Sequence, residues 1–311
     1  MPALPAKSDL DVSMPARLSQ LTRKRIERFV TLFPKALVND TPEIIHDLRV
    51  ASRRLQQILR ILLPDSDPSA HRKLSRILRK TRRALGACRN LDVSLGLVEK
   101  RLESASSASM RQARETVRVW LEEKRGTEFA KARERLIRCD LIDFIVRIQA
   151  RLADVQQNPQ TADELSERLR DASATWKDAL ASARTNPDVK AIHAFRIAGK
   201  RLRYRAESLA ALGDGSVKPL VRDLKALQDD LGDWHDRFVL RQHVAEFIER
   251  PGFLADEPGM CRGLLLEMER GKRRDRAAIT DVIARAERLT LGESEPRSSG
   301  QTGALAVDKG Q

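Results

Sequence analysis

The feature that most constrains the fold of this chain is an eleven-residue segment that occurs twice. The first copy runs from Ile45 to Leu55 and the second from Ile192 to Leu202, and both follow His-x-x-Arg-[Val/Ile]-Ala-x-[Arg/Lys]-Arg-Leu. The two histidines lie 147 residues apart, a spacing far too long for a short-repeat solenoid. The repeat therefore predicts an internal duplication of a larger unit.

Each copy separates into two faces when it is placed on an α-helix, which turns about 100° per residue. One face collects basic and amide side chains under a leading histidine: His46, Arg49, Arg53, Gln56, Gln57 and Arg60 in the first copy, and His193, Arg196, Lys200 and Arg203 in the second. The opposite face is apolar, with Leu48, Leu55 and Ile58 in the first copy and Phe195, Leu202 and Leu209 in the second. Both copies are thus predicted to be helices that bury one side and expose a cationic stripe.

The correspondence continues after each copy. Arg72, Arg76 and Arg79 match Lys218, Arg222 and Lys225 at one fixed offset, and Leu85–Val93 matches Leu231–Val239, each beginning with a Leu-Gly corner. The composition, rich in Arg, Glu, Ala and Leu with only 4% aromatics, favours helices throughout. We therefore predict an all-α fold of two related helical bundles packed about an approximate two-fold axis.

Segments rich in proline, glycine and polar residues divide the chain into regions. Residues 1–17 are predicted to be an irregular N-terminal lead-in, and residues 291–311 a disordered tail of low apolar content. The first bundle is expected at about 18–155 and the second at about 162–290, with a polar linker around Asn158-Pro159. Within these, helices are expected at 18–33, 42–63, 70–85, 93–102, 110–125, 128–155, 162–183, 189–212, 236–250 and 258–289, with one more carrying Lys218, Arg222 and Lys225.

The formal net charge of +14 and the pI near 10.2 indicate a polyanionic partner: nucleic acid, an anionic membrane surface or a phosphate polymer. The cationic stripes support this, because the segment from Arg72 to Arg83 contains no acid and like charges on neighbouring helical turns repel. Arginine presents a planar fork of donors that suits phosphate oxygens, and lysine presents a mobile point charge. The histidines have two readings, as hydrogen-bonded structural residues or as donors to phosphate.

Other classes of function lack support in the sequence. The chain contains no P-loop, no G-x-S-x-G, no H-E-x-x-H and no carboxylate cluster suited to magnesium, so we expect no enzyme, no metal and no cofactor. Cations beside His46 and His193 disfavour a metal there. Three dispersed cysteines indicate a reducing compartment, and neither a signal peptide nor a membrane span is recognisable. A cytoplasmic protein is expected.

The paired motifs resemble the CHAD family, the conserved histidine α-helical domain. The resemblance rests on His46-x-x-Arg49-x-x-x-Arg53-Arg54, on His193-x-x-Arg196-x-x-x-Lys200-Arg201-x-Arg203-Tyr204 and on the two Leu-Gly corners, and it covers about residues 18–290. It implies two pseudo-symmetric four-helix bundles with a basic groove or pore between them. It also implies binding of inorganic polyphosphate and association with polyphosphate granules. The E-x-E-x-K signature of the triphosphatase domains often fused to this family is missing, which predicts a stand-alone binding module.

The predicted polyphosphate-binding residues are the histidines and cations of the duplicated helices: His46, Arg49, Arg53, Arg72, Arg76, Arg79, Arg83, Arg89, His193, Arg196, Lys200, Arg203, Lys218, Arg222 and Lys225. Two alternatives stay open at this stage. A nucleic-acid-binding protein would share the charge but would also use aromatic stacking platforms, with nucleic acid otherwise expected as a weaker competitor. A metal-dependent polyphosphate hydrolase would need carboxylates to hold its metal ion.

Overall fold

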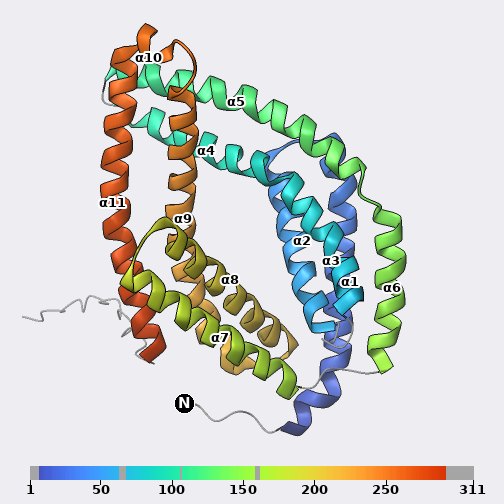
Figure 1. The fold of residues 1–311 in the computed structure, drawn as a ribbon. Helices are drawn as coiled ribbons and strands as arrows, with labels where there is room; N and C mark the ends of the chain where they lie inside the picture. The colour runs from blue at the N-terminus through green and yellow to red at the C-terminus, as the bar shows by residue number, and fades with distance from the viewer. Residues whose placement is uncertain (1–6, 63–67, 106, 158–161, 292–311) are drawn as a thin grey trace, which may run out of the picture.

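A computed structural model describes residues 7–62, 68–105, 107–157 and 162–291. The described residues form α-helices and one short 3-10 helix, and no strand occurs among them (Figure 1). The elements are α1 (Lys7–Val38), α2 (Pro42–Leu62), α3 (Pro68–Ala84), α4 (Gly86–Glu103), α5 (Ala108–Ile137), α6 (Leu141–Gln157), α7 (Ala162–Thr185), α8 (Val189–Leu212), η1 (Gly215–Val217), α9 (Lys218–Ile248), α10 (Phe253–Asp256) and α11 (Pro258–Leu291). The predicted all-α class is confirmed.

The two motif helices form close to where the sequence places them. Helix α8 begins after Asp188, whose carboxylate accepts the backbone N–H of Ala191 at 2.7 Å, and caps the helix. Its C-cap is Gly213, whose φ of 116° lies in the left-handed region. The backbone N–H groups of Gly213 and Asp214 donate back to the carbonyl oxygens of Ala210 and Leu209, which ends the helix. The boundaries of α8 therefore follow from local residues that the sequence displays.

Several boundaries differ from the prediction. Helix α4 begins at Gly86 rather than at residue 93. Helix α1 begins at Lys7, so the part of the lead-in from residue 7 onward is helical rather than irregular. Helix α5 runs through the expected break at 125–128 and ends at Ile137, before the turn at Asp140. Helix α9 passes through Leu231-Gly232 without interruption, so the prediction of a corner at this second Leu-Gly pair is wrong. The predicted tail at 292–311 and the linker at 158–161 lie outside the described residues.

The buried apolar side chains of the described residues fall into three clusters. One cluster joins α7, α8, α9 and α11 around residues such as Trp176 and Phe195. A second, around Phe29 and Leu48, involves α1 to α3 and also parts of α5, α6 and α8. A third, around Leu121 and Phe247, is built from α4, α5, α9, α10 and α11. In Figure 1, α4 and α5 extend from the helices of the second half to α1–α3, and the third core fixes that connection.

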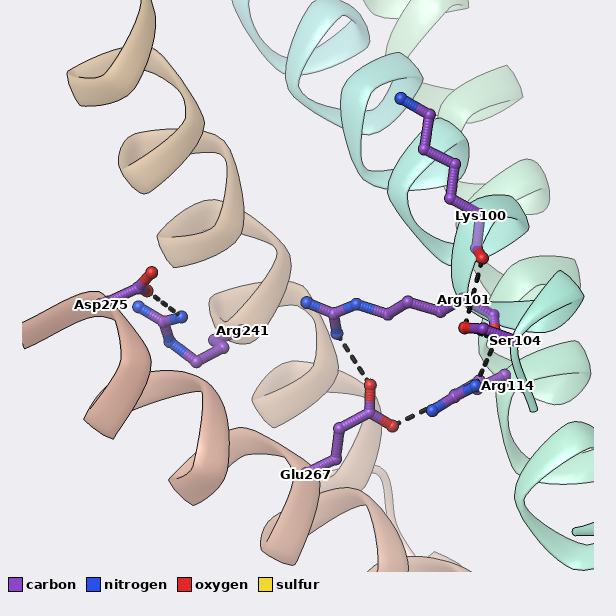
Figure 2. Close-up of polar contacts among 7 residues, drawn as sticks. All are labelled: Lys100, Arg101, Ser104, Arg114, Arg241, Glu267 and Asp275. Carbon is purple, nitrogen blue, oxygen red and sulfur yellow. Dashed lines mark hydrogen bonds and ion pairs between the residues drawn. The ribbon is translucent and has the colours of Figure 1, made fainter. Parts of the chain in front are cut away.

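Ion pairs accompany the third core. Figure 2 shows Glu267 of α11 between two guanidinium groups, Arg101 of α4 at 3.0 Å and Arg114 of α5 at 3.2 Å. About two turns further along α11, Asp275 accepts hydrogen bonds from Arg237 at 2.7 Å and from Arg241 at 2.5 Å, both on α9. Asp275 is only 3% exposed. These two carboxylates attach α11 to three other helices.

None of the helices in the described ranges combines the length and the apolar content that crossing a bilayer requires.

Candidate functional site

The stripes of the two motif helices meet at one cavity of about 490 Å³, within the size range typical of ligand pockets. Five helices line it. Helix α2 contributes His46, Arg49, Val50, Arg53, Gln56, Gln57 and Arg60; α3 contributes Arg82; α4 contributes Arg89, Asn90 and Val93; α8 contributes Arg196, Ile197, Lys200, Arg201 and Tyr204; and α9 contributes Gly232, His235 and Asp236. We call this space the basic cavity.

The helix period explains how α2 and α8 reach the basic cavity. On α2 the lining residues recur at intervals of three and four, while Ile45, Leu48 and Leu55 on the opposite side are fully buried. On α8 the same spacing leaves Phe195 and Leu202 at 1% exposure behind the lining residues. Burial of the apolar backs in two different cores therefore turns both cationic stripes toward the same space.

Hydrogen bonds hold several of these cations in place. Arg53 of α2 donates to the Tyr204 hydroxyl of α8 at 2.9 Å, which connects the two motif helices directly. Arg49 donates to the carbonyl oxygen of Arg82 at 2.6 Å, and Arg82 in turn donates to the carbonyl of Ser52 at 3.1 Å and to the side-chain oxygen of Gln56. The guanidinium groups are thus positioned by neutral acceptors, which leave their charges uncompensated.

The basic cavity contains eight cationic side chains and one carboxylate, that of Asp236. Within the described part of the chain, none of the eight cations forms an ion pair with a carboxylate. Asp236 favours the charged forms of Arg196 and Lys200 without pairing with either. Burial raises the pKa of Asp236, and Arg196, Arg89 and Lys200 oppose that rise. The cavity therefore carries a strong excess of positive charge.

The excess of positive charge, together with burial, lowers the pKa values of basic groups that line the cavity. Burial, followed by repulsion from Arg196 and Arg53, lowers the pKa of Lys200 to about 7. Burial and neighbouring arginines lower the pKa of Arg49 and of Arg82 to about 10, and burial lowers that of His235 to about 4. Each shift has the same meaning: a positive charge here is disfavoured until an anion is present.

Both motif histidines keep substantial exposure to solvent, although each also lies partly against neighbouring side chains. His46 lines the basic cavity, and burial followed by repulsion from Arg89 lowers its pKa. His193 lies beside the cavity, with its ring 5.8 Å from that of His235 and its pKa lowered by burial and then by Arg196. Both imidazoles can therefore become donors when negative charge arrives.

The structure brings together six of the fifteen predicted binding residues. His46, Arg49, Arg53, Arg89, Arg196 and Lys200 line the basic cavity. Arg203 lies next to it, over the Tyr204 ring at 4.9 Å, and pairs with Glu207 at 3.4 Å. The other cations of α3 and α9 do not line it: Arg72, Arg76, Arg79, Arg83, Lys218, Arg222 and Lys225. Arg222 pairs with the adjacent Asp223 at 2.7 Å.

Some lining residues are absent from the predicted set. Gln56, Gln57 and Arg60 lie in the predicted sector of α2, so the period alone could have identified them. His235 and Asp236 correspond to Arg89 and Asn90 in the matching corner segments, which was a usable signal. Arg82 had no such signal, because it lies on the flank of α3 away from the predicted arginine row.

Comparison with known proteins identifies a family. The profile described as the CHAD domain matches residues 20–245. Two curated proteins of Mycobacterium tuberculosis, Uncharacterized protein MT2285 (strain CDC 1551 / Oshkosh) and Uncharacterized protein Rv2226 (strain ATCC 25618 / H37Rv), are each 29% identical over 250 residues. The match covers 76% of this chain and 47% of each relative, so the chain spans about half the length of the curated relatives it matches.

Two solved structures share the fold. The crystal structure of the CHAD domain from the plant Ricinus communis aligns with a TM-score of 0.64 at 18% identity and covers 88% of this chain and 92% of that one. PptA from Streptomyces chartreusis aligns with a TM-score of 0.59 at 16% identity and covers 86% of this chain and 98% of that one. At these identities the likeness concerns the fold alone.

Proposed function

The chain belongs to the CHAD family, and on this premise we propose that the basic cavity binds inorganic polyphosphate. The observation that carries the proposal is the gathering of eight cations without a paired carboxylate in one cavity. Buried or half-buried charges without partners are unfavourable in the empty protein. A chain of phosphates supplies the missing negative charge along its whole length, and arginine and lysine are the side chains suited to hold it.

The proposal includes the finer architecture expected from the sequence, an internal duplication with the basic cavity between its halves. Residues matched by the repeat occupy the cavity in pairs: Arg49 with Arg196, Arg53 with Lys200, and Asn90 with Asp236. A two-fold arrangement of this kind suits a ligand that is itself a repeating polymer, because equivalent groups meet equivalent phosphates. We further propose that the protein acts as a binder in the cytoplasm and associates with polyphosphate granules.

Nucleic acid is the first alternative ligand. A protein that holds single strands normally stacks bases on aromatic rings, and Tyr204 is the one Phe, Tyr or Trp side chain among the lining residues of the basic cavity. The Tyr204 hydroxyl accepts a hydrogen bond from Arg53, and the guanidinium group of Arg203 lies over the Tyr204 ring. That face of the ring is therefore not free to stack on a base. These contacts favour a ligand without bases.

A metal-dependent hydrolase is the second alternative. Asp236 is the single carboxylate of the lining, and among the described residues no three His, Cys, Asp or Glu side chains come together as a metal-binding group. Phosphoryl transfer ordinarily relies on carboxylate-held magnesium. We therefore propose binding without turnover, which phosphate release with added magnesium or manganese would contradict.

The decisive test removes one cation from each motif helix. The variant Arg49→Gln with Arg196→Gln is expected to weaken binding of long-chain polyphosphate by roughly a hundredfold, since each charge-assisted hydrogen bond contributes about 1.5 to 3 kcal/mol. Calorimetric titration measures the affinity, and circular dichroism checks that helicity and melting are retained. The matched control, Arg262→Gln with Arg270→Gln on the exposed surface of α11, loses the same charge far from the cavity.

Competition decides between the two polyanions. Polyphosphate and single-stranded RNA are offered at equal phosphate concentration to the same protein. Polyphosphate is expected to displace the RNA. Equal or tighter binding of the RNA, lost in the same double variant, would assign the basic cavity to nucleic acid instead.

A further inference from the structure

A second cavity, of about 380 Å³, lies between α3, the end of α5 and the beginning of α6. We call it the outer cavity. Its floor is apolar and firmly packed, with Leu74 and Phe144 at 2% and 3% exposure. Its rim is basic and contains five cations, Lys73, Arg76, Lys80, Arg138 and Arg147, together with the carboxylates of Asp140 and Asp143.

The two carboxylates are already committed to other groups. Asp143 pairs with Arg147 at 2.7 Å, and Asp140 accepts the backbone N–H of Asp143 at 2.8 Å as the cap of α6. In the described part of the chain, Lys73, Arg76, Lys80 and Arg138 have no ion-pair partner. The outer cavity thus resembles the basic cavity in its excess of positive charge, since five cations and two carboxylates leave a net charge of +3 among its lining residues.

Helix α3 connects the two cavities. At 100° per residue, Arg82 points to one flank of α3 and Lys73 and Lys80 point to the opposite flank, about 160 to 180° away. The predicted arginine row fills the arc between these flanks, on the side where Arg72, Arg76 and Arg83 are exposed and Arg79 is half-buried. Seven cations and no acid therefore run around α3 from the basic cavity to the outer cavity.

This arrangement is unusual for a helix face that only meets solvent. Exposed faces elsewhere in this protein intersperse acids with bases, as Arg118 does with Glu115 and Glu122 on α5. Like charges three and four residues apart destabilise a helix by a few tenths of a kcal/mol per pair. The row of cations on α3, which contains no acid, therefore destabilises this helix in the absence of a ligand. A polyanion lying along the row would remove that cost.

We propose that the outer cavity is a second phosphate-binding site, and that one long polyphosphate chain crosses α3 over the arginine row to occupy both cavities. The inference rests on the proposed function of the basic cavity and extends it. It gives a role to the predicted α3 residues that do not line the basic cavity. It also predicts that the protein prefers long polyphosphate chains, because a short chain reaches one cavity and a long chain reaches both.

The energetic consequence is avidity. Once a chain is held in the basic cavity, its free end meets the outer cavity as an intramolecular partner at high effective concentration. Long chains are therefore expected to bind at least about tenfold more tightly than tripolyphosphate at equal phosphate concentration, with the difference depending on the outer cavity.

The test compares three variants that each lose three positive charges. The outer-cavity variant carries Lys73→Gln, Arg76→Gln and Lys80→Gln. The row variant carries Arg72→Gln, Arg79→Gln and Arg83→Gln. The control carries Arg262→Gln, Arg270→Gln and Arg273→Gln on exposed α11. Glutamine has a helix propensity close to those of lysine and arginine, and thermal melting confirms that each variant folds.

Long-chain polyphosphate, tripolyphosphate and orthophosphate are titrated into each variant. The outer-cavity and row variants are expected to lose about tenfold or more in affinity for the long chain relative to the control. Tripolyphosphate is expected to occupy two sites on the control and one on the outer-cavity variant. Long-chain affinities equal to that of the control would overturn the inference, and so would an outer cavity that orthophosphate fills as readily as the chain does.

The same titrations separate this inference from the proposed function. If Arg49→Gln with Arg196→Gln weakens the long chain and the outer-cavity variant does not, the basic cavity keeps its function and the second site is rejected. If neither variant has an effect, both proposals fail together.

Discussion

Among single residues, Lys200 is the one whose charge is most sensitive to what the basic cavity contains. It is half-buried on α8, and Arg196, Arg53 and Arg203 disfavour its protonation while Asp236 favours it. With its pKa lowered to about 7, it is partly neutral near physiological pH in the empty protein. A polyphosphate chain nearby reverses the local field and favours the ammonium form.

Polyphosphate binding is therefore expected to take up protons and to weaken as pH rises above about 7. The sign follows from the preference of the complex for protonated Lys200, whereas the empty protein releases that proton at lower pH. Calorimetry in buffers of different ionisation enthalpy measures the uptake. The variant Lys200→Arg, which stays charged, is the control and is expected to remove the Lys200 share of it.

The motif histidines contribute to the same titration at lower pH, since burial and neighbouring cations lower the pKa of both His46 and His193. Only the difference between the wild-type protein and Lys200→Arg reports on the lysine. Identical proton uptake by the two proteins would show that Lys200 does not sense the ligand.

At the level of elements, α11 holds the second half of the chain to α4 and α5. Its two buried or half-buried carboxylates each pair with two arginines. Glu267 pairs with Arg101 and Arg114, and Asp275 pairs with Arg241 (Figure 2). Asp275 also pairs with Arg237. Because the partner of a buried ion pair remains charged when the other is removed, breaking such a pair is costly even where forming it contributes little.

The variant Asp275→Asn is expected to destabilise the protein by about 3 to 5 kcal/mol, since it leaves Arg241, which is 9% exposed, without its counter-charge. Chemical denaturation measures the loss. The matched control is Glu269→Gln on the same helix, which breaks a solvent-exposed pair with Lys272 and is expected to leave the free energy of unfolding nearly unchanged. Equal losses would mean that the Asp275 pairs do not stabilise the junction.

For the whole molecule, the net charge of +14 is distributed unevenly, with unpaired cations in the two cavities and paired ones on α5 and α11. Binding of a polyanion to such a surface releases the counter-ions of the polymer, so affinity depends on salt. The slope of the logarithm of the affinity against the logarithm of the salt concentration is proportional to the number of phosphates that the protein contacts.

The logarithm of the polyphosphate affinity is expected to fall linearly with the logarithm of the salt concentration. The double variant of Arg49 and Arg196 should reduce the slope by about two, because each lost phosphate contact reduces it by about one. Titrations across a salt series measure the slope. Weaker binding with an unchanged slope would indicate that the two arginines support the fold rather than contact phosphate.

The sequence by itself determined the features that depend on local periodicity. It predicted the helices around both motifs, including the range 189–212 of α8, and the cationic face of α2, because a helix places residues three and four apart on one side whatever surrounds it. It also predicted the family, through motifs that lie within single helices.

Only the tertiary structure decided which cationic faces meet. The sequence treated the arginine row of α3 and the stripe of α2 alike, yet packing turns Arg82 rather than Arg76 into the basic cavity and turns Arg76 into the outer one. The tertiary structure also decided that α9 runs through Leu231-Gly232, since one continuous helix buries Leu231 in the core shared with α7, α8 and α11 and, on its opposite side, Leu240 and Val244 in the third core. The physical reason is common to both: the rotation of a helix about its axis is fixed by the partners of its apolar side, and these partners come from distant parts of the chain.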